Sequence, residues 1–148
     1  KATAVGAASG IVAGLVAITP ACANLSPHWA IVLGLVAGGL CAVAIEFKYK
    51  LGFDDSLDVV GIHLVGGLIG TLYLGFFAIG SGLFTGGGNL DQFIVQLIPA
   101  LAVGLYSFTV AFILGKVIDK TIGFRIKEDE EAAGIDSVLH GEEGYALS

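Results

Sequence analysis

The sequence is poor in charged residues, cysteine and methionine. These shortages exclude a soluble domain and a disulfide framework, and they bear on where the chain begins. Only 14% of its 148 residues are charged, 55% are hydrophobic, and the mean hydropathy is +0.89. Soluble domains carry about 25% charged residues, so this composition excludes a soluble domain and predicts a membrane protein. Residue 1 is Lys and there is no Met, so we expect a processed or truncated piece in which no signal or transit peptide should be sought.

The patterns of soluble enzymes are missing too. The two cysteines, Cys22 and Cys41, fall on successive predicted helices and support no disulfide framework. The three histidines, His28, His63 and His140, are too far apart in sequence and depth to form one local metal site. There is no phosphate-binding glycine loop and no serine nucleophile elbow. We therefore predict that the protein is not an enzyme and binds no metal and no cofactor.

Charge is concentrated at the C-terminal end. Residues 119–148 hold eight acidic and three basic side chains, which accounts for −5 of the net charge of −6, and this balance speaks against a nucleic acid partner. Before that tail lie four apolar runs, at about 2–23, 28–47, 54–80 and 91–118. We expect an all-α polytopic membrane helix bundle with four transmembrane helices in residues 1–118, and a polar tail in residues 119–148.

The basic residues predict the orientation of these spans in the bilayer. Four spans place all seven lysines and arginines on one side and none on the other. Cytoplasmic loops carry the excess of basic residues in membrane proteins, so the basic side, with the C-terminal tail, is expected to be cytoplasmic.

The third run, DDSLDVVGIHLVGGLIG at 54–70, holds the residue that most needs an explanation. A helix that begins near Asp54 carries His63 roughly 14 Å inward, about half of the ~30 Å hydrocarbon thickness. Ionisable side chains at such depth usually face a bundle interior or a water-filled path, so we favour a functional histidine. The alternative is a histidine that bonds a neighbouring helix as a packing contact.

Glycines surround this histidine in sequence. Gly66, Gly67 and Gly70 follow on its side of the predicted helix, and Val59 precedes it by one turn. The imidazole is thus expected beside bare backbone, which suits either a close helix neighbour or a narrow lumen.

In the first run, Pro20 is expected to unwind the helix near its end and to free a backbone carbonyl around Val16. The Thr19 hydroxyl then either bonds its own backbone or offers a polar group to a path, and the sequence leaves both interpretations open.

Three segments resemble a known family, and they occur in the order that the family has them. They are IVAGLVAITPAC at 11–22, DDSLDVVGIHLVGG at 54–67, and GFRIKEDEEAAGID with HGEEGY within 123–145. They resemble the last four spans and the tail of the ammonium transporter (Amt/Mep/Rh) family, closest to its bacterial Amt branch. The resemblance implies the C-terminal part of an eleven-span inverted-repeat subunit, a homotrimer with one pore per subunit, and nitrogen uptake across the cell (plasma or inner) membrane.

The resemblance also implies roles for individual residues. His63 matches the second histidine of the family's pore pair, Val59 an apolar residue that lines the path, and Thr19 a hydroxyl beside it. Asp58 matches a structural acid at the cytoplasmic mouth. The partner histidine, the phenylalanine gate and the outer aromatic site belong to earlier spans.

The resemblance implies a role for the tail as well. The tail is implied to contact the neighbouring subunit and to dock PII-class signalling proteins, and the matching residues are Arg125, His140, Gly141, Glu142 and Tyr145. A solvated, inert tail is the alternative.

The chemistry of the substrate suggests a mechanism. A bare ammonium ion would pay tens of kcal/mol to enter hydrocarbon, whereas a buried group usually becomes neutral instead. Ammonium can lose a proton and potassium cannot. Because desolvation favours the neutral imidazole, we expect ammonium to be deprotonated, NH3 to pass, and His63 to help relay the proton. An ammonium sensor with signalling through the tail, and a structural subunit of a membrane complex, are the alternatives.

Overall fold

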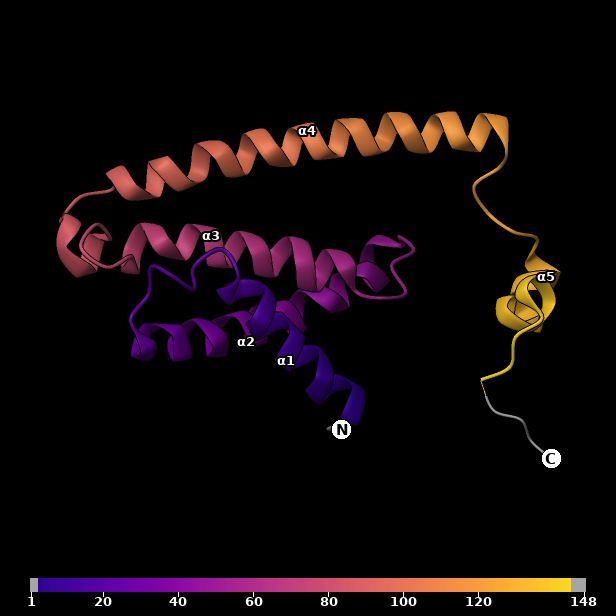
Figure 1. The fold of residues 1–148 in the computed structure, drawn as a ribbon, viewed down its shortest axis with the longest axis horizontal. Coiled ribbons are helices and arrows are strands. Elements are labelled where there is room, and N and C mark those ends of the chain that lie inside the picture. The colour runs from indigo at the N-terminus through magenta and orange to yellow at the C-terminus, as the bar shows by residue number, and fades with distance from the viewer. Residues whose placement is uncertain (1–2, 145–148) are drawn as a thin grey trace. The chain divides into compact units, whose positions relative to one another are not determined.

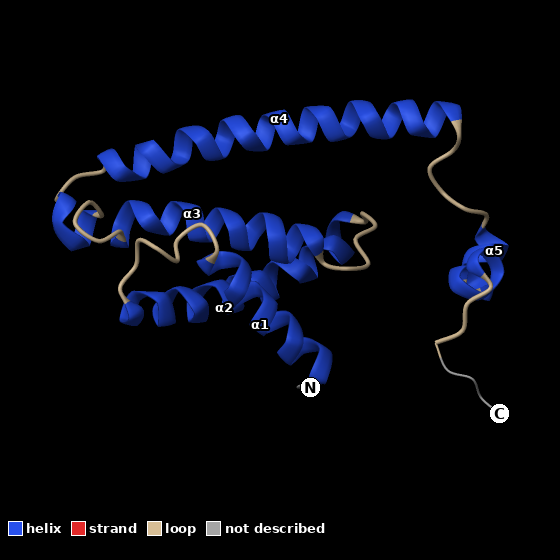
Figure 2. Cartoon of the chain, viewed as in Figure 1, coloured by secondary structure: helices blue, strands red, loops and turns tan. Residues whose placement is uncertain are grey.

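The structure is a computed structural model that describes residues 3–144, and within these residues every regular element is helical. Five α-helices follow one another (Figures 1 and 2): α1 Ala4–Ile18, α2 Pro27–Leu51, α3 Val65–Phe77, α4 Asp91–Thr121 and α5 Glu128–Ala133. Three short π-helical turns accompany them: η1 Val60–Leu64, η2 Leu83–Gly87 and η3 Asp136–His140. The chain divides into two compact units, Lys1–Val103 and Gly104–Ser148.

Within the described part of the chain, three helical segments are long and apolar enough to cross a membrane: Pro27–Leu51, Val60–Phe77 and Asp91–Thr121. The all-α, polytopic membrane character predicted from the sequence is confirmed. The first apolar helix, α1, has 15 residues and is shorter than the about 20 that a perpendicular span needs. It ends just before Pro20, where the sequence predicted unwinding, because proline cannot donate the next backbone hydrogen bond.

The helix that carries His63 begins later than predicted. We expected it to start near Asp54, but helical geometry begins at Val59, so this prediction is wrong. Asp55 supplies the reason: its carboxylate accepts hydrogen bonds from the backbone N–H of Val59 at 2.8 Å and of Val60 at 2.9 Å, which is the capping of a helix start. His63 therefore lies about 6 Å along the axis from the helix start, instead of roughly 14 Å.

Alanines make up about half of the buried core of the first unit, beside larger side chains such as Leu33 and Leu74. Ala17 and Ala37 are fully buried, and Ala13 is nearly so. Gly70 of α3 lies so close to α1 that a Cβ there would be 1.9 Å from the Ala17 carbonyl oxygen. Such close approach is how helices associate in lipid, where packing replaces the hydrophobic driving force. It fixes the η1 and α3 segment against α1.

Candidate functional site

His63 lines a hollow of about 550 Å³ on the surface of the first unit. The wall on one side comes from the end of α1 and the turn after it, and the other comes from η1 and α3. Its six lining residues are Val16, Thr19, Pro20, His63, Gly67 and Thr71. The structure thus brings together two of the predicted path residues, His63 and Thr19, which are 44 positions apart in the sequence.

The imidazole is exposed and sits in the π-helical turn Val60–Leu64. Within residues 3–144 it makes no hydrogen bond. A π turn has one residue more than an α turn and is found often at functional sites, where it turns a side chain away from the regular helical register. The ring accordingly points into a hollow with both nitrogens available for a donor or an acceptor.

Thr71 also lines the hollow, two turns beyond His63 on the same helical segment. Sequence reasoning missed it as a site residue. The signal was present, because His63, Gly67 and Thr71 are spaced four apart and residues at this spacing share one helical face. Thr71 and Thr19 give the otherwise apolar wall two hydroxyl groups.

Thr19 makes the backbone hydrogen bond that one of the two interpretations expects, and its role beside a path stays a prediction. Its hydroxyl donates to the Leu15 carbonyl at 2.7 Å, so its proton is used within its own helix. The side chain is nevertheless exposed and lines the hollow, and its oxygen keeps lone pairs that accept hydrogen bonds. The carbonyl of Val16 is not left free, because the Thr19 N–H approaches it at 3.3 Å.

The three glycines after His63 do not share one side. Gly67 lines the hollow, and a Cβ there would meet nothing within 4 Å. Gly66 and Gly70 instead approach α1, at Val16 and Ala17 respectively, so the expectation that all three flank the imidazole is wrong for these two. One side of α3 thus packs closely against α1, and the adjacent side faces the His63 hollow.

Val59 is not brought to the hollow. It is half exposed, at the first position of the helix, and it is not among the lining residues. The π turn between Val59 and His63 closes from residue i to i+5, so two residues four apart no longer stack as they would in an α-helix.

Asp58 lies at the start of the same helix and pairs with Lys48 near the end of α2. Lys48 also donates to the Asp55 carbonyl at 2.9 Å. Asp58 has a φ of 57°, in the left-handed region, and is the one non-glycine residue with positive φ among residues 3–144. Sequence reasoning treated Lys48 only as a charge that orients the spans.

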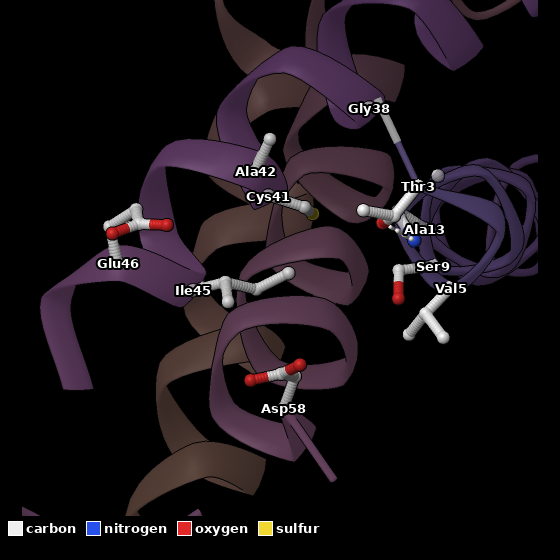
Figure 3. A pocket seen from close by; sticks show the side chains of 12 residues that line it. Thr3, Val5, Ser9, Ala13, Gly38, Cys41, Ala42, Ile45, Glu46 and Asp58 are labelled. Carbon is white, nitrogen blue, oxygen red and sulfur yellow. Dashed lines mark hydrogen bonds between the residues drawn. The ribbon is translucent and has the colours of Figure 1, made fainter. Parts of the chain in front are cut away.

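A second hollow, of about 430 Å³, lies where α1 and α2 meet. Figure 3 shows Ser9 and Ala13 on the α1 side, Cys41 and Ile45 on the α2 side, and Asp58 at one end. Its lining is distinct from that of the His63 hollow. Asp58 and His63 therefore line different hollows, although they are only five residues apart in the sequence.

In the second unit, the described tail residues include an ion pair between Arg125 and Glu131. Arg125 donates from Nη2 and Nε to the Glu131 carboxylate, at 2.9 and 3.1 Å. His140 ends the π-helical turn η3, and Gly141 follows with a φ of 65°, which glycine adopts without strain. The Glu142 N–H donates to the Asp136 carbonyl at 3.0 Å and closes this turn. Tyr145 lies outside the described residues.

Together, the long apolar helices of the described residues define a polytopic helical membrane protein, with the His63 hollow on the surface of its first unit. The model of the Ammonium Transporter Family matches residues 1–145, and the chain belongs to this family. The membership in this family that the sequence motifs predicted is thereby confirmed.

Individual relatives agree with the family. The chain is 49% identical to an ammonium transporter of Mycobacterium tuberculosis over 98% of this chain and 33% of the relative. It is 37% identical to an ammonium transporter of Bacillus subtilis, over 98% of this chain and 37% of the relative. The crystal structure of Saccharomyces cerevisiae Mep2 is similar with a TM-score of 0.76 and 35% identity, covering 87% of this chain and 31% of Mep2. The chain spans about a third of the length of the relatives it matches.

Proposed function

We propose that a full-length protein containing this chain transports ammonium across the membrane, with NH3 passing a histidine-lined apolar pore. The observation that carries the proposal is the His63 hollow: an exposed imidazole and two threonine hydroxyls in a wall otherwise made of Val16, Pro20 and Gly67. In a full-length subunit, further spans would cover this surface and turn the hollow into a passage. The names of the relatives support the same substrate.

The composition of the hollow supports deprotonation of the substrate. None of the described residues that line it is a carboxylate, which is the group that would stabilise a passing cation by charge. NH3 needs only hydrogen-bond partners, and the imidazole and the hydroxyl oxygens supply acceptors for its N–H groups. A neutral imidazole accepts at one nitrogen and donates from the other, so His63 can bond NH3 and exchange a proton with ammonium.

Flux through the full-length protein tests this function. In proteoliposomes, an inward ammonium gradient should drive transport, and methylammonium uptake should be inhibited by ammonium and not by potassium at equal concentration. Protein-free liposomes are the control. Uptake equal to that of the control would contradict transport, and an ammonium-dependent conformational change without uptake would instead support a sensor.

The rest of the assembly belongs to the same proposal. We place the full-length protein in the cell (plasma or inner) membrane, as a homotrimer, with its C-terminal tail in the cytoplasm. The distribution of basic residues supports this orientation, because all seven fall on the side of the tail when four spans are drawn.

We also propose that residues 119–148 form a regulatory tail that contacts the neighbouring subunit and a PII-class protein. The Arg125–Glu131 pair supports a defined start of this segment, since the guanidinium contacts both carboxylate oxygens and such bidentate geometry is specific. The η3 turn, closed by the hydrogen bond from the Glu142 N–H to the Asp136 carbonyl, supports a folded segment over an extended charge run.

Deletion of residues 134–148 should lower both PII binding and transport by the full-length protein. Binding is measured with purified PII-class protein, and transport by methylammonium uptake. The matched control replaces these residues with a scrambled segment of equal length and composition, which keeps the charge and loses the turn. If the deletion changed neither measurement, or if the scrambled tail behaved as wild type, the regulatory role would be wrong.

A further inference from the structure

The Lys48 side chain joins the end of α2 to the turn that precedes the His63 helix. Its ammonium group pairs with the Asp58 carboxylate and donates to the Asp55 carbonyl at 2.9 Å. The Lys48 and Asp58 side chains are only 13% and 23% exposed, so the pair is largely shielded from solvent. Shielded pairs with such contacts hold geometry better than exposed ones, which are screened and mobile.

The residues that Lys48 holds are the ones that start the helix. The Asp55 carboxylate caps the N–H groups of Val59 and Val60. The Asp58 carbonyl accepts from the Ile62 N–H at 2.8 Å, which is the first turn of the helix. His63 is the next residue. Any shift of the turn at residues 55–58 is therefore transmitted within one helical turn to the imidazole.

The backbone of this turn needs such support. Asp58 has a φ of 57°, a conformation that residues with a Cβ atom adopt at a cost, although Asp and Asn tolerate it best among them. Without a restraint, the extended and right-handed regions compete with it. Because the carboxylate of the same residue is bound by Lys48, the ion pair restrains the strained backbone directly.

A second contact with the same face of α2 completes the restraint. Gly61 packs on Ile45, with a Cβ position only 2.8 Å from the Ile45 Cγ1 atom. Ile45 and Lys48 are three residues apart and share one face of α2. The π turn is thus held at two points by a single helical surface, and both points lie within five residues before His63.

We propose that Lys48 is a positioning residue, which acts through Asp55 and Asp58 to set the orientation of the His63 ring in its hollow. The inference rests on the proposed function, in which His63 contacts the passing molecule. Loss of the pair frees the turn at Asp58 and lets the π turn rotate or revert to an α turn. The ring would then sample several orientations relative to Thr19 and Thr71.

The test compares Lys48→Met with Lys50→Met in the full-length protein. Methionine keeps the length of the side chain and removes its charge and donors, and Lys50 lies two residues away at the same helix end, outside the ion pair. We expect K48M to lower the maximal rate of methylammonium uptake by about 10- to 100-fold. Half-saturation should stay within about twofold of wild type, since only the residues near His63 move. K50M should behave as wild type.

A spectroscopic readout separates positioning from general destabilisation. With ¹⁵N-labelled histidine in the reconstituted protein, the His63 ring resonances, assigned by their loss in H63A, should broaden or split in K48M and stay single in K50M. Lys48→Arg should restore a single set of resonances and at least part of the rate. The Asp58 side of the ion pair is tested with Asp58→Asn. Asparagine also tolerates the left-handed backbone, so this variant removes only the charge. D58N should fold, and should reproduce the broadening even if K48M is not recovered in folded form.

The outcomes distinguish this inference from the function it rests on. If wild type carries no ammonium flux, the transport function is wrong, while the ring resonances still report whether Lys48 orients His63. If wild type transports and K48M and D58N match K50M in rate and spectra, the positioning role is overturned and the transport function stands. Equal loss of folded protein and of rate in K48M, K48R and D58N, with unchanged His63 resonances, would also overturn it.

Discussion

Replacing His63 with alanine in the full-length protein is expected to lower ammonium-driven transport by about 100-fold or more, or to change the ions that pass, because among the described residues that line the hollow only the imidazole has a ring nitrogen that can take up and release a proton. The hydroxyls of Thr19 and Thr71 can form hydrogen bonds with NH3 but are poor proton acceptors from ammonium. The hollow would also become larger by the volume of a ring and open to hydrated cations. Methylammonium uptake and potassium permeability in proteoliposomes measure the two effects.

His28→Ala is the matched control for this experiment. His28 is also exposed, lies near the start of α2, and contacts the Ser26 hydroxyl at 3.2 Å instead of lining the His63 hollow. It should leave both uptake and potassium exclusion unchanged. His63→Gln refines the test, because glutamine keeps a donor and an acceptor and cannot carry a proton. Wild-type uptake and wild-type potassium exclusion in His63→Ala would contradict the pore role, whereas wild-type behaviour in His63→Gln alone would contradict only the proton relay.

Most of the helices could be predicted from the sequence, because apolar runs of sufficient length leave few alternatives in a bilayer. The start of the His63 helix could not. An apolar run shows where a helix is favourable, but its first residue is decided by side chains that compete for backbone N–H groups. Here the Asp55 carboxylate captures Val59 and Val60, and the left-handed Asp58 ends the preceding turn. Three nearby acids gave no indication of which one would cap.

The candidate site shows the same division. Helical spacing correctly relates His63 to Gly67, and it would also have identified Thr71. It could not assign Gly66 and Gly70, because angular position on one helix does not reveal which sector a neighbouring helix occupies. The partnership of His63 with Thr19 joins two distant segments and came from the family resemblance, not from spacing. Lys48 had no signal beyond its charge, since its contacts depend on how α2 meets the turn at residues 55–58.

The close approach of α3 to α1 at Gly70 leads to the largest expected effect on stability. A Cβ at this position would lie 1.9 Å from the Ala17 carbonyl oxygen, 2.8 Å from its carbon and 3.0 Å from the Pro20 Cγ atom. Two of the three atoms are backbone, so no side-chain rotation relieves the clash and α1 must move away from α3. Gly70→Ala should therefore lower the free energy of unfolding by about 3 kcal/mol, the upper end of the usual cost of overpacking.

Gly67→Ala provides the control within the same helix, because nothing lies within 4 Å of its Cβ position. In an α-helix this exchange is neutral or stabilising by up to about 1 kcal/mol. Thermal unfolding of the purified full-length protein should thus show a lower Tm for G70A and an unchanged or higher Tm for G67A. Equal Tm values would mean that α1 and α3 are not in contact at Gly70. Val16, Thr19 and Pro20 form the α1 side of the His63 hollow. If α1 moves, this wall moves with it, so folded G70A should also transport less than wild type.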